Sequence, residues 1–294
     1  MTSERERAAL VALLRVGRRP WSECARQTEA SGSALTLLER ALGGEAQTTL
    51  LSEDSEPLLE QAAADIARWA ADGARLVTVL DDAYPPNLRE VHDRPPLIFV
   101  AGALEPGDDR AIAIIGARRA SSEGLRLASN ASAEFTRAGY VVVSGLAAGI
   151  DTAAHRAALS EPEGRTVAVI GTGLQHSYPP QNAALQTEIT ERGAVISQFW
   201  PDSPPSRDSF PLRNAVMSGL SRGSVVIEAS ERSGARTQAR LALGHARPVF
   251  LLSRVLSQPW AREFSTREDV HVVESATEVV AVLERASGRS SCQP

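Results

Sequence analysis

Short apolar runs, most of them β-branched, recur from residue 112 onward and limit the fold more than any other feature of the sequence. They are "IAIIG" (112–116), "YVVVSG" (140–145), "TVAVIGTG" (166–173), "AVISQF" (194–199), "SVVIEAS" (224–230), "PVFLL" (248–252) and "VHVVES" (270–275). Because successive residues are apolar, both faces of each strand must be buried, as in a parallel sheet covered by helices on both sides. Stretches of helical character at 121–139, 181–193 and 233–245 can supply the two covers. The sequence therefore predicts an α/β fold with a doubly wound, mostly parallel sheet.

The N-terminal part of the chain follows a different pattern. Residues 5–42 place apolar residues at helical spacing, in "AALVALLR" (8–15) and "ALTLLERAL" (34–42), which indicates short helices. The polar and acidic segment 43–60 is typical of a linker, and a helix is expected to follow in "LLEQAAADIARWAADG" (58–73), closed by Gly73. We therefore expect a small helical module and its linker over residues 1–60, and the α/β domain over residues 61–294.

Composition limits both the location and the chemistry of the protein. The apolar runs are too short to cross a bilayer, and the N-terminus mixes Glu with Arg in a way that a secretory signal does not. We expect a cytoplasmic protein with no membrane partner. Cys24 and Cys292 stand at opposite ends of the chain, which favours neither a disulfide framework nor a metal-ligand pair. No metal ion and no cofactor are expected.

The charge pattern bears on nucleic-acid binding. The formal net charge of −5 excludes a wholly basic, histone-like binder but not a local basic groove. The chain contains no Lys, so every side-chain cation that meets a phosphate must be an Arg guanidinium or a protonated His.

The segments that follow the strands predict where a ligand binds. In a doubly wound sheet, ligands lie beyond the carboxyl ends of the strands. Residues 116–124, 144–159, 171–182 and 228–240 follow four of these strands and combine small residues with the start of a helix. Free N–H groups and positive helix ends at such junctions suit a phosphate.

The segment "SGLAAGIDTAAHRAAL" contains the clearest pattern of this kind. Gly145 and Gly149 let the backbone turn sharply and let a polyanion come close. Asp151 and His155 lie one helical turn apart. They form either a polar pair that faces the ligand or, as we favour, a structural pair in which Asp151 caps the helix and His155 bonds to it.

Several enzyme classes lack their motifs here. "GTGLQH" has no third glycine of the dinucleotide fingerprint, and a chain without Lys cannot form a P-loop. The pattern G-x-S-x-G occurs as "GLSRG" (219–223), but it precedes an apolar run, whereas a nucleophile elbow follows a strand and opens a helix. We expect no enzymatic activity and no catalytic residue.

Arginines gather in residues 110–126 and 203–247, and Arg213 is unusual among them. It lies in the otherwise apolar segment "FPLRNAVMSGLS" (210–221), where a cation is costly without an anionic partner. A bound phosphate could be that partner. An internal ion pair with Asp151 or Glu228 is the alternative.

Five segments, taken in order, resemble the DprA/Smf family of DNA-processing proteins. They are "YPPNLREVHDRPPLIFVAG" (84–102), "AIIGARRASSEG" (113–124), "VVSGLAAGIDTAAHRAAL" (142–159), "RTVAVIGTGLQHSYPPQN" (165–182) and "FPLRNAVMSGLSRGSVVIEASERSGART" (210–237). The resemblance covers about residues 75–252. It implies an extended Rossmann-like fold that binds single-stranded DNA, protects it and loads RecA onto it during natural transformation. It also implies an N-terminal module similar to a SAM domain and a homodimer.

The matching motifs imply which residues contact DNA. The first loop contributes Gly116, Arg118 and Ser121, and the second contributes Gly145 and Gly149. Arg165 stands where the family commonly has Lys, and Phe210, Arg213 and Asn214 match the F-P-x-R-N segment. The last loop contributes Ser233 and Gly234, and we add Arg236 as a candidate contact, although the family usually has small residues after this motif.

The sequence also departs from the family pattern. "LLSRVLSQPWAREF" (251–264) replaces a glycine-rich stretch, and no winged-helix module is expected after about residue 287. Two alternatives therefore stay open. One is a nucleotide-binding sensor or hydrolase with a Rossmann-like domain, and the other is a divergent paralogue that acts in defence against foreign DNA.

Overall fold

The computed structural model describes residues 2–17, 19–43, 55–231 and 233–290 of the chain. Residues 44–54, which form most of the expected linker, and Cys292 lie outside these ranges. The strands are β1 (Arg75–Thr78), β2 (Leu97–Gly102), β3 (Ala111–Gly116), β4 (Val141–Ser144), β5 (Thr166–Val169), β6 (Ala194–Ser197), β7 (Ser224–Glu228), β8 (Val249–Leu252) and β9 (Val270–Val273). Every one of the apolar runs quoted above overlaps a strand.

These strands form one sheet in the order β1-β2-β6-β5-β4-β3-β7-β8-β9. From β6 to β9 all neighbours are parallel, whereas β2 is antiparallel to both β6 and β1. The prediction of a mostly parallel α/β sheet is confirmed. The antiparallel edge formed by β1 and β2 was not predicted.

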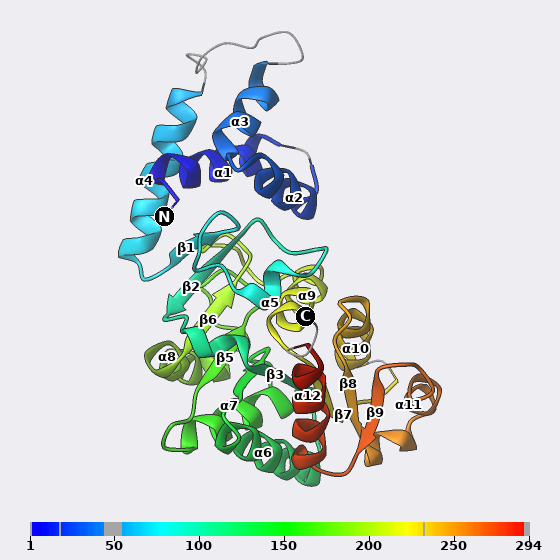
Figure 1. Cartoon of the computed structure of the whole chain (residues 1–294). Helices are drawn as coiled ribbons and strands as arrows, with labels where there is room; N and C mark the ends of the chain where they lie inside the picture. The colour runs from blue at the N-terminus through cyan, green and yellow to red at the C-terminus, as the bar shows by residue number, and fades with distance from the viewer. Residues whose placement is uncertain (1, 18, 44–54, 232, 291–294) are drawn as a thin grey trace.

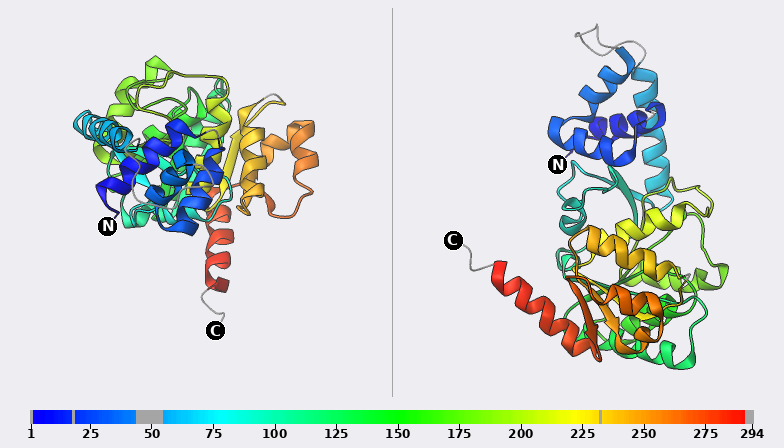
Figure 2. Two further views of the ribbon diagram at one scale, coloured as in Figure 1. Left: turned by 90° about the horizontal axis from the view of Figure 1, so that it is seen from above. Right: turned by 90° about the vertical axis from the view of Figure 1, so that its right-hand side faces the viewer.

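Helices cover both faces of the sheet. The α-helices of the described ranges are α1 (Glu4–Val16), α2 (Trp21–Ser31), α3 (Ala34–Gly43), α4 (Glu56–Ala71), α5 (Pro86–Arg89), α6 (Ser122–Arg137), α7 (Ile150–Ser160), α8 (Ala183–Arg192), α9 (Ser209–Leu220), α10 (Gly234–Gly244), α11 (Pro259–Phe264) and α12 (Ala276–Ser290). α6 packs against α7 and α12 on one face, and α9 packs against α5 and α10 on the other. α12 projects away from the body of the molecule in both views of Figure 2. Within the described ranges, no helix has both the length and the apolar character needed to cross a bilayer.

The direction of winding changes between β3 and β7. From β3 the chain steps outward through β4 and β5 to β6, and then returns through α9 to β7 on the other side of β3. The connections on the two sides leave in opposite directions, so a crevice opens at the carboxyl ends of β3 and β7. The pairing register also shifts here, between Ile115 and Gly116.

The N-terminal helices form a group beside the β1–β2 edge (Figure 1). They share one apolar cluster with these strands, in which the rings of Trp69 and Phe99 lie 5.1 Å apart and those of Trp69 and Trp200 5.7 Å apart. The helical nature of this part is confirmed. The expected linker needs a correction, because residues from Glu56 onward belong to α4, which packs against α1 through apolar residues such as Leu59. The expected domain boundary at residue 60 therefore falls inside a helix.

Candidate nucleic-acid interface

A cavity of about 860 Å³ lies at the crevice between β3 and β7. The loops after β3, β7 and β8 line it, together with the first turns of α7 and the N-terminal half of α9. Eight of the predicted contact residues line this cavity: Gly116, Arg118, Ser121, Phe210, Arg213, Asn214, Ser233 and Gly234. Segments far apart in the sequence thus meet at the position that the winding of the sheet predicts.

Arg213 provides the most unusual cation of the cavity. Its side chain is only 6% exposed, and its Nη1 lies 3.9 Å from Asp151 Oδ2, the outer limit of an ion pair. The one hydrogen bond of its guanidinium within the described ranges is a long contact of 3.9 Å to Met217 Sδ, and Nε is buried without a partner. Burial lowers the pKa of Arg213, and Asp151 opposes this effect. A buried guanidinium in this state retains strong hydrogen-bonding capacity for an anion.

The structure bears on both alternatives for Arg213, a phosphate partner and an internal ion pair. The internal partner is Asp151 rather than Glu228, but the pair is too loose to satisfy the guanidinium. Arg213 therefore lines the cavity and also faces a carboxylate.

Asp151 uses its carboxylate on the backbone. Its Oδ2 accepts from the N–H groups of Gly145 and Ala147 at 3.2 and 3.3 Å. Burial raises the pKa of Asp151, although Arg213 and these donors act in the opposite direction. Two backbone donors that the sequence analysis assigned to a phosphate are therefore occupied by the protein.

The two glycines of this segment serve the packing of the protein itself. A Cβ on Gly145 would overlap the guanidinium of Arg213. Gly149 has φ +83°, and a Cβ there would overlap the carbonyl oxygen of Ala117. The close approach inferred from the sequence is real, but the groups that approach are Arg213 and the first loop.

The structural pair expected from the sequence is wrong in both parts. Asp151 accepts from backbone N–H groups that precede α7 and does not cap that helix, and His155 does not pair with Asp151. Its Nδ1 lies 2.8 Å from Thr166 Oγ1, and the ring is completely buried. Burial, together with the nearby Arg213 charge, lowers the pKa of His155 to about 3, so the ring is neutral at pH 7. The structural role favoured for this residue fits its environment.

The start of α6 is already occupied by a carboxylate. Glu228 accepts from Ser121 N at 2.9 Å and from Ser121 Oγ at 2.5 Å. Arg254 Nη2 lies 3.5 Å from the same carboxylate and also lines the cavity. The sequence analysis missed Arg254, because it lies in the segment where this chain departs from the family pattern.

The rim of the cavity combines cations with ring faces. The guanidinium of exposed Arg118 lies 4.9 Å from the centre of the Phe210 ring, and the Tyr178 ring lies 5.6 Å from Phe210. Neither Arg118 nor its neighbour Arg119 forms an ion pair in the part of the chain that the structure describes. Among the residues that the structure describes, four arginines line the cavity against two carboxylates, so the charge favours an anion.

The remaining predicted residues have other surroundings. Arg165 precedes β5 and lies at the opposite edge of the sheet, with its Nε 2.6 Å from Asp108 Oδ1. Arg236 pairs with Glu231 and is not among the residues lining the cavity. A direct role of either residue in binding stays a prediction, and Arg165 cannot act in this cavity.

Comparisons with known proteins agree with this geometry. The family described as DNA recombination-mediator protein A matches residues 75–283. DNA processing protein DprA of Bacillus subtilis is 34% identical over 197 residues, and that of Streptococcus pneumoniae is 41% identical over 175 residues. The matches cover 67% and 60% of this chain, and 66% and 61% of the relatives, which is just under two thirds of their length.

Solved structures extend the comparison to the whole fold. The X-ray structure of DprA from Streptococcus pneumoniae has a TM-score of 0.75 at 29% identity, and the match covers 95% of this chain and 98% of that one. DNA processing protein A from Helicobacter pylori, described with its single-stranded DNA binding mode, has a TM-score of 0.63 at 25% identity. That match covers 72% of this chain and 96% of the other. On its sequence and its fold, the chain belongs to the DNA recombination-mediator protein A family, the DprA/Smf DNA-processing proteins.

Proposed function

We propose that the cavity between β3 and β7 binds the backbone of single-stranded DNA. In this role the protein protects incoming single strands and loads RecA onto them in the cytoplasm, as a homodimer. The resemblance to DprA/Smf proteins supports the parts that concern RecA, the homodimer and the location.

The observation that carries the proposal is the state of Arg213. A buried cation with a distant carboxylate and an unpartnered Nε is costly unless a further anion approaches it. A DNA phosphate offers oxygens that accept hydrogen bonds from a guanidinium fork. The cavity in front of Arg213 has room for a backbone segment.

Glu228 directs where a phosphate can bind. Its carboxylate already accepts the Ser121 donors at the start of α6 and would repel a phosphate there. Arg213 belongs to α9, and Arg118 lies over the Phe210 ring of the same helix. The carboxylate on this side, Asp151, already accepts from two backbone N–H groups and faces Arg213. The strand is therefore expected to cross the α9 side of the cavity.

The aromatic rings at the cavity rim favour binding of single-stranded DNA over duplex DNA. A single strand can bring its phosphates into the cavity and lay its bases on the ring faces of Phe210 and Tyr178. The bases of a duplex are paired inside its helix and cannot stack in this way. Ring stacking depends little on the base, so we expect weak sequence preference.

The same site supports binding rather than catalysis. Asp151 is engaged with two backbone donors, and His155 is buried, neutral and bonded to Thr166. Neither can activate a nucleophile in the cavity from these positions. We therefore propose that the protein has no catalytic residue.

The test is an anisotropy titration with a labelled oligo(dT), a duplex of the same length, and free mononucleotides as competitors. We expect tighter binding of the single strand, with an affinity that falls with salt by a slope of about 0.7 for each phosphate contacted. Equal or tighter binding of the duplex would overturn the proposal. Displacement of the strand by micromolar mononucleotide would instead favour the nucleotide-binding alternative.

A further inference from the structure

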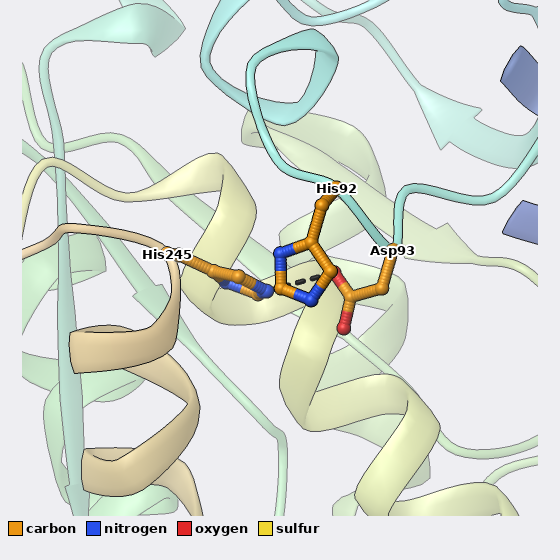
Figure 3. A group of neighbouring side chains, drawn as sticks. All are labelled: His92, Asp93 and His245. Carbon is orange, nitrogen blue, oxygen red and sulfur yellow. Dashed lines mark hydrogen bonds and ion pairs between the residues drawn. The ribbon is translucent and has the colours of Figure 1, made fainter.

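Three side chains outside the cavity bring potential metal ligands together. His92 and Asp93 lie in the loop between α5 and β2, and His245 lies at the C-terminal end of α10. One ligand atom from each of the three lies within 4.8 Å of the others. Figure 3 shows the His92 ring and the Asp93 carboxylate beside the ring of His245.

His245 is held as metal-binding histidines usually are. Its side chain is only 1% exposed, and its Nε2 lies 2.7 Å from Asp93 Oδ1. Its Nδ1 lies 3.0 Å from Ser218 Oγ, which fixes the orientation of the ring. An outer partner of this kind on the second nitrogen is characteristic of histidine ligands.

The same contacts resemble a hydrolytic triad, but the geometry excludes that use. Hydrogen bonds link Ser218 to His245 and His245 to Asp93, in the order of nucleophile, base and orienting acid in such a triad. Ser218 is completely buried within α9, so a substrate carbonyl cannot reach its Oγ. The open side of the group is that of His92, which is exposed to solvent.

The arginines around the three side chains leave the Asp93 carboxylate available to bind a metal ion. Arg94 pairs with Glu29, and Arg247 pairs with Glu90. Within the described ranges, the side-chain partner of the Asp93 carboxylate is His245, at 2.7 Å. The carboxylate is thus not neutralised by an arginine.

We propose that His92, Asp93 and His245 bind a divalent transition-metal ion of the zinc type, with water as the fourth ligand. Two imidazoles and one carboxylate form a common donor set for Zn²⁺, at about 2.0–2.2 Å from the ion. Those lengths place tetrahedral ligand atoms about 3.3 Å apart. The 2.7 Å contact between His245 and Asp93 must then open slightly, and the exposed His92 ring must turn inward.

The ion would connect two parts of the domain. The loop that holds His92 and Asp93 leads into β2, whereas α10 begins at the cavity with Ser233 and Gly234. Zinc therefore ties the far end of α10 to the β1–β2 side of the molecule. The proposal concerns stability and does not depend on DNA binding.

The test uses the full chain without a polyhistidine tag, stripped of metal with a chelator. Isothermal titration with ZnCl₂ is expected to show one equivalent bound, and the melting temperature is expected to rise with zinc concentration. His92→Ala, at an exposed ring, is expected to weaken zinc binding by roughly 100-fold and to leave the metal-free melting temperature unchanged. Ser218→Ala is expected to weaken binding by about 10- to 100-fold through loss of the outer partner.

His271→Ala is the matched control, because His271 lies on β9 and stacks on Phe250 away from this group. It is expected to bind zinc as the unchanged protein does. Equal zinc affinity in the His92 and His271 variants would overturn the proposal. So would the failure of stoichiometric zinc to bind or to raise the melting temperature.

Discussion

Replacing Arg213 by Met separates the role of its charge from its role in packing. Met keeps an unbranched side chain against Gly145 and removes the guanidinium that faces the cavity. A hydrogen bond to a charged group contributes about 1.5–3 kcal/mol, and 1.4 kcal/mol corresponds to a factor of ten. We therefore expect affinity for single-stranded DNA to fall by roughly 10- to 150-fold, with a salt slope smaller by about 0.7.

The stability of the fold is expected to change little in the same variant. Loss of one partner of a well-formed buried ion pair costs about 3–5 kcal/mol. The pair with Asp151 is loose at 3.9 Å, and Asp151 keeps its two backbone donors. A swap that roughly conserves volume then costs less than about 1.5 kcal/mol.

Arg222→Met is the control for this prediction. Arg222 pairs with Asp109 at 2.8 Å and precedes β7, at the edge of the sheet opposite the cavity. Its loss is expected to leave DNA affinity unchanged. The assays are anisotropy titration and urea unfolding of both variants. A large loss of stability in Arg213→Met, with normal DNA affinity of the folded protein, would refute the reasoning.

Three further variants test other parts of the site. Gly145→Ala places a methyl group on the Arg213 guanidinium, so we expect a similar loss of DNA affinity in anisotropy, and almost no additional loss in the double variant with Arg213→Met. Arg165→Met removes the pair with Asp108 at the opposite edge; urea unfolding is expected to detect a lower stability, and a clear loss of DNA affinity would place part of the strand there. His155→Gln tests the buried ring. The pKa of His155 is about 3 in the folded protein and about 6.5 in the unfolded chain. Between these pH values the unfolded state binds more protons, so the folded protein loses stability as the pH falls from 6.5 towards 3. Urea unfolding between pH 7 and pH 4.5 is expected to show this loss, up to about 1.4 kcal/mol per pH unit, in the unchanged protein only. The same loss in His155→Gln would contradict the assignment of the pH dependence to His155.

The parallel part of the fold could be predicted from the sequence because its signal is local. Runs such as 140–145 and 224–230 are apolar at consecutive positions and end in small residues, a pattern that favours a buried parallel strand. The strands β1 and β2 were missed. β1 reads "RLVT" and lacks the apolar run that marks the parallel strands, and the antiparallel pairing of β2 with β6 depends on tertiary contacts that local pattern does not specify.

The linker was misassigned for a related reason. Polar and acidic composition suggested a linker up to residue 60, although a helix was expected from residue 58. Glu56 instead begins α4, and the apolar face of that helix, with Leu59 and Trp69, packs on α1 and β2. Packing of a single apolar face was enough to outweigh the polar character of the first turn.

The candidate site was predictable in position but not in its internal bonds. The rule that ligands bind at the carboxyl ends of parallel strands pointed to the segments that follow them, and those after β3 and β7 do line one cavity. Sequence could not show that Glu228 occupies the start of α6, or that Asp151 takes the backbone donors of the loop before α7. Such contacts join residues on different loops and depend on side-chain rotamers.

The metal-ligand group was beyond sequence reasoning as well. Asp93 and His245 are separated by 152 positions, and neither forms a short metal-binding motif with a neighbour. Only the packing of α10 against the α5–β2 loop brings them together.

The crystal structure of this chain with a short oligo(dT) would test the central claim most directly. We predict that the strand crosses the α9 side of the cavity, with a phosphate oxygen about 2.7–2.9 Å from a guanidinium nitrogen of Arg213. Bases are predicted to lie against the rings of Phe210 and Tyr178. A strand bound on another face, with Arg213 still facing only Asp151, would contradict the account.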